Sequence, residues 1–418
     1  MRSLSRRVLL SAAAGAMALG VGLGQAAAQD TIKIGVLATL EGAFTVLGED
    51  SMRGADLAFM QHDNMAGGKK IEVINGSSDA SPDSAIAAAR KLVEQDGVDI
   101  LIGPLSGSEG LAIRDYAKTQ PQVTFVNGTS AAADTTLREP ADNFFRFTTD
   151  GTQWQAGLGE YVYNEKGWKT AVVVAEDYSF PYSQVMGFML PFCEAGGKVV
   201  DKFWVPIGTK DYSTIVASIP DDIDAIYVAL GGADAVNFLS QYEQAGGDKP
   251  LVGGSITVDQ TVLGSEGKLK ENLVGTPSAG PIADNWDDPR WDAFVTAYQN
   301  AFPDGFPSPS LFAHGYYVST VAVLEALDQV NGDLSNGQAA FRDALTNLEL
   351  DSPTGMVKLD QNRQAIADIF LTEVQLGEDG KLYNEVVKVI PAVSQTMGMD
   401  RQAFLDLGPA SRDNPSCE

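Results

Sequence analysis

The stretch VDILIGPLSGSEGLAIRDYA, residues 98–117, decides the fold. Its first five residues, 98–102, are mostly β-branched or leucine and predict a short buried strand. A glycine-rich turn at 103–110 then leads into apolar residues with helical spacing. A strand that passes through a turn into a helix is the unit from which parallel sheets covered by helices are built.

The same unit repeats along the chain. Further strands are predicted at 32–37, 71–74, 123–126, 171–174, 199–205 and 225–228. Helical patterns lie between them, at 48–65, 82–95, 109–119, 182–195 and 233–245. The series fills residues 31–148 and begins again within 149–275. The sequence therefore predicts an α/β protein with two doubly wound parallel-sheet lobes.

Three stretches predict crossings between the lobes. Residues 148–151, 275–278 and 352–355 are rich in glycine, proline and threonine and suit hinges, although ordinary loops have the same composition. Helices at 291–302 and 311–330 are expected to return to the first lobe, and 356–374 to rejoin the second. The predicted boundaries are 29–148 plus 277–354 for lobe 1, 149–276 plus 355–395 for lobe 2, and 396–418 for a C-terminal tail.

The N-terminus has the pattern of an export signal, predicted as a signal peptide over residues 1–28. Arg6 and Arg7 precede an apolar run at 8–24, and the alanines at 26–28 offer a cleavage site. The arginine pair resembles a twin-arginine signal; the general secretory route stays open. An uncleaved membrane anchor is the alternative, but the run is short and broken by glycine. No cysteine lies near the cleavage point, so we expect a soluble periplasmic protein without a lipid anchor.

The composition excludes nucleic acid as a partner. The 418 residues carry a formal net charge of −26, spread along the chain, whereas a phosphate-binding face needs clustered lysine and arginine. We expect a solvated acidic surface and a monomer. The two cysteines, Cys193 and Cys417, permit a disulfide in an oxidising compartment, and two separate thiols are the alternative.

Ligands in doubly wound sheets bind beyond the carboxyl ends of the strands. In the first lobe, two such junctions, at 103–110 and 127–131, are expected to lead into helices and to present hydroxyls and free backbone N–H groups. They would hold a carboxylate, unless their serines and threonines only cap helices. In the second lobe, Tyr178 and Phe180 follow a strand and would either close over an apolar ligand or pack in the core. The pair Gly231 and Gly232 permits close backbone approach.

An enzyme is not predicted. His62 and His314 are the only histidines, and we expect surface or packing roles for both. The sequence contains no zinc-protease, nucleophile-elbow, paired-cysteine or P-loop motif, and the turn at 103–110 lacks the dinucleotide-binding spacing. We therefore expect no catalytic residues, no metal and no cofactor.

Five motifs together resemble the periplasmic leucine/isoleucine/valine-binding family, the type I solute-binding proteins of ABC importers. They are IGVLATLEGA at 34–43, LIGPLSGS at 101–108, NGTS at 127–130, AEDYSFPY at 175–182 and QYEQAGG at 241–247. The resemblance implies two lobes joined by three hinges that close on a small solute and present it to ABC permease subunits. The ligand-binding residues that it implies are Ser106, Gly107, Ser108, Gly128, Thr129, Ser130, Tyr178, Phe180, Gly231, Gly232 and the loop 254–257, with Ser255 and Thr257.

Two departures from the family pattern leave the solute open. Amino-acid binders of the family supply an acid from the last loop, where this chain has Ser255 and Thr257, and Leu47 replaces a usual aromatic residue. The sequence therefore fits a branched-chain amino acid, with Glu176 or Asp177 as the ammonium partner, or an aromatic or other apolar carboxylate. A sensor that presents its bound state to a chemoreceptor or kinase is the alternative to transport.

Overall fold

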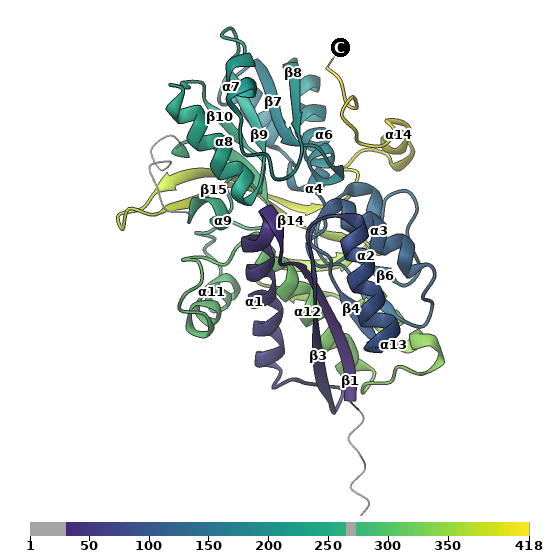
Figure 1. The fold of residues 1–418 in the computed structure, drawn as a ribbon. Helices are drawn as coiled ribbons and strands as arrows, with labels where there is room; N and C mark the ends of the chain where they lie inside the picture. Colours follow the sequence, from purple (N-terminus) through teal and green to yellow (C-terminus); the bar gives the residue numbers. More distant parts are fainter. Residues whose placement is uncertain (1–30, 265–272, 418) are drawn as a thin grey trace, which may run out of the picture. The chain divides into compact units, whose positions relative to one another are not determined.

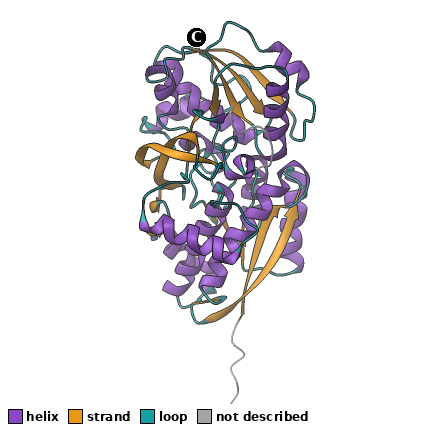
Figure 2. Cartoon of the chain, turned by 90° about the vertical axis from the view of Figure 1, so that its left-hand side faces the viewer, coloured by secondary structure: helices purple, strands orange, loops and turns teal. Residues whose placement is uncertain are grey.

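The computed structural model describes residues 31–264 and 273–417, which form two α/β lobes (Figure 1). The predicted signal peptide lies outside the described residues. Each lobe is built on its own β-sheet, and the sheets contain six and nine strands. This confirms the predicted fold class. Figure 2 shows helices on both sides of the strands.

The first sheet comes entirely from the N-terminal part of the chain and has the order β2-β3-β1-β4-β5-β6. All of its neighbours run parallel except β2, which forms a hairpin with β3. Its strands are β1 Thr31–Thr39, β2 Met65–Ala66, β3 Lys69–Ser78, β4 Ile100–Ile102, β5 Thr124–Val126 and β6 Phe144–Phe145.

Helices cover both faces of this sheet because alternate side chains of its strands point to opposite faces. Ile34 of β1 packs with helices α1 and α12, whereas Leu37 packs with α2 and α3. The helices of this lobe are η1 Gly42–Phe44, α1 Thr45–Gln61, α2 Pro82–Arg90, η2 Lys91–Gln95, α3 Gly107–Ala117, η3 Ala133–Thr135, α11 Pro289–Ala301, α12 Leu311–Gln329 and α13 Ser335–Asn347.

The second sheet has a parallel half and an antiparallel half. Strands β8, β7, β9, β10 and β11 run parallel, and β11 then pairs with β14 in the antiparallel sense. The strands are β7 Thr170–Glu176, β8 Lys198–Val205, β9 Ala225–Ala229, β10 Leu251–Gly253, β11 Pro277–Gly280, β12 Leu350–Ser352, β13 Gly355–Leu359, β14 Ala365–Leu376 and β15 Leu382–Val393.

Helices also pack on both faces of the second sheet. Val173 of β7 lies in one apolar cluster with α5 and α6, and Val174 lies in another with α8 and α9. The helices here are α4 Gly151–Trp154, α5 Leu158–Asn164, α6 Ser179–Glu194, α7 Ser213–Ser218, α8 Gly232–Gln244, α9 Gln260–Leu263 and, near the C-terminus, α14 Arg401–Asp406.

The second of the three predicted crossings differs from its predicted position. Residues 275–278 were expected to leave lobe 2, yet Pro277 and Ser278 belong to β11, which pairs with β14 in the second sheet. The small side chains of this strand fit beside β14, and the chain leaves the sheet only after Gly280. The third predicted crossing lies in the hairpin between β12 and β13.

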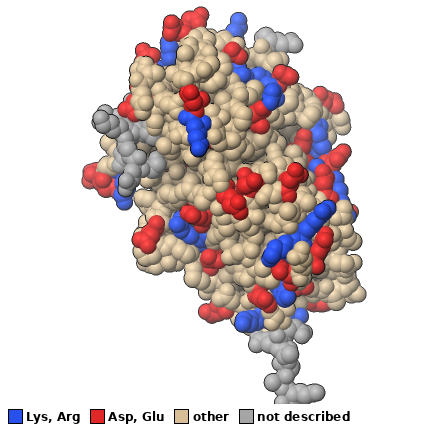
Figure 3. Space-filling model, in the orientation of Figure 1, with Lys and Arg blue, Asp and Glu red and all other residues tan. Residues whose placement is uncertain are grey.

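Figure 3 shows acidic and basic side chains scattered over one face of the molecule, without a basic patch. None of the described helices combines the length and the apolar character that a membrane crossing needs. Cys193 and Cys417 form a disulfide with a Cα–Cα distance of 5.4 Å, so the alternative of two separate thiols is excluded.

Candidate functional site

A small cavity of about 10 Å³ lies between residues of the two lobes. Its walls are almost entirely apolar. Lobe 1 contributes Leu47, Leu105, Gly107, Thr129 and Phe312, and lobe 2 contributes Trp154, Tyr178, Phe180 and Ile256. This volume is about that of a single water-sized sphere, so the lobes must part before a solute can enter. The chemistry of the lining suits a largely apolar ligand.

Aromatic rings form the lobe 2 wall. The Trp154 and Phe180 rings meet edge to face with centroids 5.3 Å apart, and Tyr178 lies 6.1 Å from Phe180. Such edge-to-face contacts are favoured by the ring quadrupole. The Trp154 indole N–H donates to the Thr149 hydroxyl at 2.8 Å, which fixes the orientation of the ring. The wall is thus a set of held aromatic faces that a flat apolar ligand can contact.

The Thr129 hydroxyl in the cavity lining lacks a protein partner. Thr129 is 3% exposed, and its hydroxyl has no hydrogen-bond partner among the described residues. A buried hydroxyl without a partner costs free energy comparable to a lost hydrogen bond, so such an atom marks a place for a ligand group. The first turn of α3 begins at Gly107, in the same lining, and the N–H groups of Gly107 and Ser108 have no intrahelical partner, whereas that of Glu109 is capped by Ser106. Together these donors suit a carboxylate.

The serines of the first junction form a helix cap. The Ser106 hydroxyl accepts a hydrogen bond from the Glu109 N–H at 3.4 Å, and the Glu109 carboxylate accepts one from the Ser106 N–H at 2.8 Å. This capping box uses the Ser106 side chain for the helix. The Ser108 hydroxyl lies 3.1 Å from that of Ser179 in the other lobe. Of the first-junction residues predicted to bind ligand, the structure places Gly107 at the cavity.

The sequence predicts a helix after the second junction, but the structure has no α-helix there. A three-residue 3-10 helix follows, and the loop is held by side chains instead. The Ser130 hydroxyl donates to the Asn127 side-chain oxygen at 2.5 Å, and the guanidinium of Arg146 donates to the carbonyls of Ser130 and Ala132. These carbonyls accept hydrogen bonds from Arg146 instead of from the backbone N–H groups of a following helix. Gly128 packs against the ring of Tyr316, so the NGTS stretch presents Thr129 to the cavity.

The second-lobe glycines and hydroxyls serve packing. The Gly231 N–H donates to a Glu176 side-chain oxygen at 3.0 Å, and a Cβ at Gly232 would lie 2.9 Å from Leu47 of the other lobe. The Ser255 hydroxyl accepts a hydrogen bond from the Gln184 side chain at 2.5 Å. The Thr257 hydroxyl lies 2.7 Å from the Val228 carbonyl. Between these two, Ile256 reaches the cavity.

The described cavity lining offers no carboxylate to a ligand ammonium group. None of the described residues that line the cavity carries a charge. Burial raises the pKa of Glu176, whose carboxylate accepts from Gly231, while Asp177 pairs with Arg412 and with the Tyr182 hydroxyl. Asp259 accepts the N–H of Leu311 at 2.8 Å. Glu176 keeps one buried oxygen, Oε2, without a hydrogen-bond partner, but neither Glu176 nor Asp177 lines the cavity.

Direct contacts bring the lobes together around the cavity. A Cβ built on Gly107 of lobe 1 would lie 2.7 Å from the Cβ of Phe180 in lobe 2. Such a distance is too short for ordinary packing, so only glycine permits this approach. The Ala133 N–H also donates to the Ser183 hydroxyl of α6 at 3.0 Å. The structure therefore shows the lobes in contact over the site.

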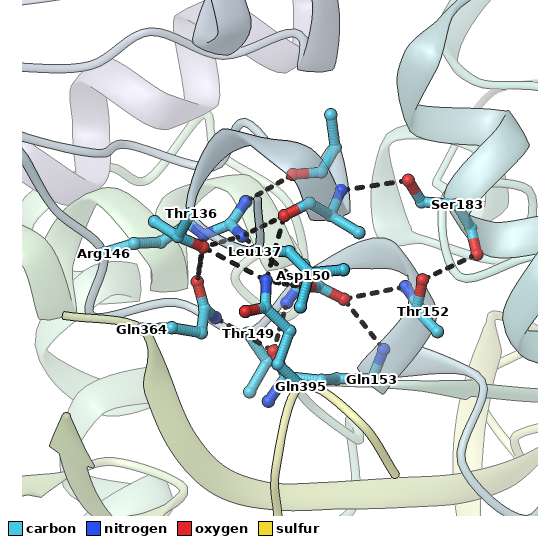
Figure 4. Close-up of polar contacts among 12 residues, drawn as sticks. Thr136, Leu137, Arg146, Thr149, Asp150, Thr152, Gln153, Ser183, Gln364 and Gln395 are labelled. Carbon is cyan, nitrogen blue, oxygen red and sulfur yellow. Dashed lines mark hydrogen bonds and ion pairs between the residues drawn. The ribbon is translucent and has the colours of Figure 1, made fainter. Parts of the chain in front are cut away.

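A buried polar network joins the crossings beside the cavity (Figure 4). The Arg146 side chain is fully buried, lies 3.5 Å from the Asp150 carboxylate and also donates to Gln364. Gln153 donates to the carbonyls of Ala365 and Val393 at 2.9 and 2.8 Å. Buried polar groups satisfied in this way rigidify a structure. The network fixes the first crossing against the segment that enters β14.

The histidines occupy the packing and surface roles expected for them. His314 is buried between Trp291 and Phe294, and burial lowers its pKa to about 3, so its imidazole is neutral. The Nδ1 atom of His62 lies 3.0 Å from the Ala58 carbonyl of its own helix. Within the described residues, no group of three or more His, Cys, Asp or Glu side chains is placed to hold a metal ion.

Sequence reasoning missed several cavity residues. Trp154, Phe312 and Leu105 had not been singled out, although they form much of the lining. Trp154 comes only a few residues after the first predicted crossing, at 148–151. This position was its only sequence signal for a place near the cavity. Phe312 belongs to a helix that is distant in sequence from the loops that form the rest of the lining. Its position depends on the return of the chain to lobe 1.

Two α/β lobes that enclose a small apolar cavity with the unpaired Thr129 hydroxyl define a protein that holds a solute between its lobes. The chain belongs to the periplasmic binding protein family, whose model matches residues 31–381. This confirms the resemblance noted from the motifs. The family consists of binding proteins rather than enzymes.

Curated relatives and solved structures agree with this assignment. Leu/Ile/Val-binding protein homolog 6 of Brucella melitensis is 26% identical over 374 residues, with 87% of this chain and 92% of that protein covered. An ABC transporter substrate-binding protein from Sphaerobacter thermophilus is 28% identical, with a TM-score of 0.78 over 87% of this chain and 98% of that one. A Rhodopseudomonas palustris solute-binding protein solved with benzoate shares the fold at 23% identity, a TM-score of 0.80 and the same coverage.

Proposed function

We propose that this protein captures a small aromatic carboxylate between its lobes and delivers it to the permease of an ABC importer. The observation that carries the proposal is the cavity lining. Aromatic rings form one wall, Thr129 offers a free hydroxyl, and the first turn of α3 offers N–H groups. The carboxylate would accept hydrogen bonds from these donors while its ring contacts Trp154 and Phe180.

A branched-chain amino acid is the second candidate, because the Brucella relatives are named for leucine, isoleucine and valine. Its ammonium group would be buried in this cavity without a carboxylate partner among the described lining residues. Burying a neutral polar group without a hydrogen bond costs about 2–7 kcal/mol, and burying an unpaired charge costs more. The cavity chemistry therefore favours an aromatic acid over an amino acid.

The cellular setting follows from the family and from the N-terminal sequence. We infer that residues 1–28 direct export and that the mature protein works in the periplasm. Ligand that contacts both lobes favours the closed form, and that form would be the one that docks on the permease subunits. Transport is preferred to sensing because the Sphaerobacter structure at 28% identity is a transporter component.

Native mass spectrometry of a ligand mixture tests the proposal. Ligand-stripped protein is incubated with equal concentrations of benzoate, 4-hydroxybenzoate, leucine and isoleucine, and the retained mass is read. We expect a complex with one of the aromatic acids. In Thr129→Val, the fraction of protein that carries this acid should be lower than in wild type. Retention of leucine or isoleucine in preference to both aromatic acids would overturn the proposed ligand class.

A further inference from the structure

The last residues of the chain, 395–417, cross from one lobe to the other; we refer to them as the strap. In lobe 1, Phe404 of α14 is buried in a cluster with Ala133 and Leu137. The guanidinium of Arg138 donates to the Leu405 carbonyl at 3.1 Å. These contacts anchor the start of the strap beside the loop that follows the Thr129 junction. Figure 1 shows this yellow segment beside α6.

The end of the strap is anchored on lobe 2. Cys417 is disulfide-bonded to Cys193 in the last turn of α6. The Lys202 ammonium donates to the Pro415 carbonyl at 2.9 Å. Met186, in the middle of α6, packs with Phe404 of the strap. The strap therefore runs along α6, the helix whose first turn carries Phe180.

Between the anchors, the strap contacts the loop that leads into the cavity. The Arg412 guanidinium forms a two-pronged ion pair with the Asp177 carboxylate, in which Nε donates to Oδ1 at 2.7 Å and Nη2 pairs with Oδ2. Asp177 directly precedes Tyr178 and lies three residues before Phe180, two rings of the cavity wall. Bidentate arginine–carboxylate pairs fix geometry as well as adding stability.

We propose that Arg412 is a positioning residue for ligand binding. It holds residues 177–180 so that Tyr178 and Phe180 keep their places at the cavity, and the Cys193–Cys417 disulfide holds Arg412 over Asp177. The inference rests on the proposed function, since it assigns the strap a role in keeping the bound solute enclosed. Release of the strap should loosen this loop and speed ligand dissociation.

Substitutions at Arg412 test the proposal, with an exposure-matched ion pair as control. Arg412→Gln removes the pair, and Arg412→Lys keeps the charge without the two-pronged geometry. The control is Lys91→Gln, because Lys91 pairs with Asp96 at 2.8 Å and is 60% exposed, against 61% for Arg412. Benzoate dissociation is followed by stopped-flow fluorescence, since Trp154 lines the cavity.

For Arg412→Gln we expect benzoate to dissociate about fivefold faster. Arg412→Lys should recover part of the difference, and Lys91→Gln should match wild type. The double change Cys193→Ser with Cys417→Ser should speed dissociation to a similar extent. An unchanged dissociation rate in Arg412→Gln overturns the inference, as does an equal increase in Lys91→Gln.

Amide hydrogen exchange of the ligand-free variants separates this inference from the proposed function. The readout is a peptide covering residues 177–183, and it needs no ligand. In Arg412→Gln this peptide should exchange several-fold faster, while a peptide over 91–96 stays as in wild type. If benzoate binds none of the proteins, the proposed ligand fails and exchange alone decides the role of Arg412. Unchanged exchange at 177–183 contradicts that role.

Discussion

Replacing Arg146 by methionine should destabilise the protein far more than removing an exposed arginine. Its guanidinium is fully buried and reaches three backbone carbonyls, Gln364, Thr136 and the Asp150 carboxylate. Burial lowers its pKa to about 10, so the group is still charged at pH 7. Methionine fills part of the space but leaves Asp150 buried without its cation. Breaking a buried pair in this way costs about 3–5 kcal/mol.

Urea unfolding followed by circular dichroism measures this cost, with Arg290→Met as the matched control. Arg290 pairs with Asp288 and Asp351 but is 41% exposed, and exposed pairs contribute at most about 1 kcal/mol. The double change Arg146→Met with Asp150→Asn should recover part of the loss, because no unpaired charge remains. If Arg146→Met costs no more than Arg290→Met, the network does not stabilise the crossings as argued.

Three further predictions concern the site and its acids. Gly107→Ala should weaken ligand binding about tenfold with little change in the unfolding midpoint, because the added Cβ would meet Phe180 of the other lobe and hold the lobes apart; unchanged affinity by calorimetry would refute this. Thr129→Val should weaken carboxylate binding about 10- to 100-fold, the effect of a lost hydrogen bond to a charged group; an intact affinity would remove Thr129 from the site. Burial raises the pKa of Asp234 to about 6 and that of Asp259 to about 7 from 3.8, so the folded protein holds protons that the unfolded chain releases, and stability should fall as the pH rises from about 4 to 7. Urea midpoints at pH 5 and pH 8 check this, and Asp234→Asn should reduce the difference between them.

The alternation of strands and helices was predictable because its signals are local. The strand at 98–102 and the helix after it follow from apolar periodicity, and Ser106 with Glu109 has the spacing of a capping box. Residues 124–126 and 225–229 likewise form strands close to the predicted positions. Each of these elements depends on residues within a few positions of itself.

What the sequence could not supply depends on distant partners. The strand Pro277–Gly280 has the composition of a turn and is a strand because it pairs with β10 and with β14, the latter almost a hundred residues later. The loop after Thr124–Val126 lacks the expected helix because Arg146 takes its carbonyls. The serine hydroxyls predicted to bind ligand cap a helix or pair with other side chains, whereas the Thr129 hydroxyl is unpaired.

Titration calorimetry of ligand-stripped protein with benzoate and with leucine, run side by side, tests the central claim most directly. The claim is that an apolar cavity with aromatic walls, Thr129 and the N-terminus of α3 selects an aromatic carboxylate without an ammonium group. The account predicts saturable binding of benzoate and much weaker binding of leucine. Tight binding of leucine with no heat from benzoate would contradict it.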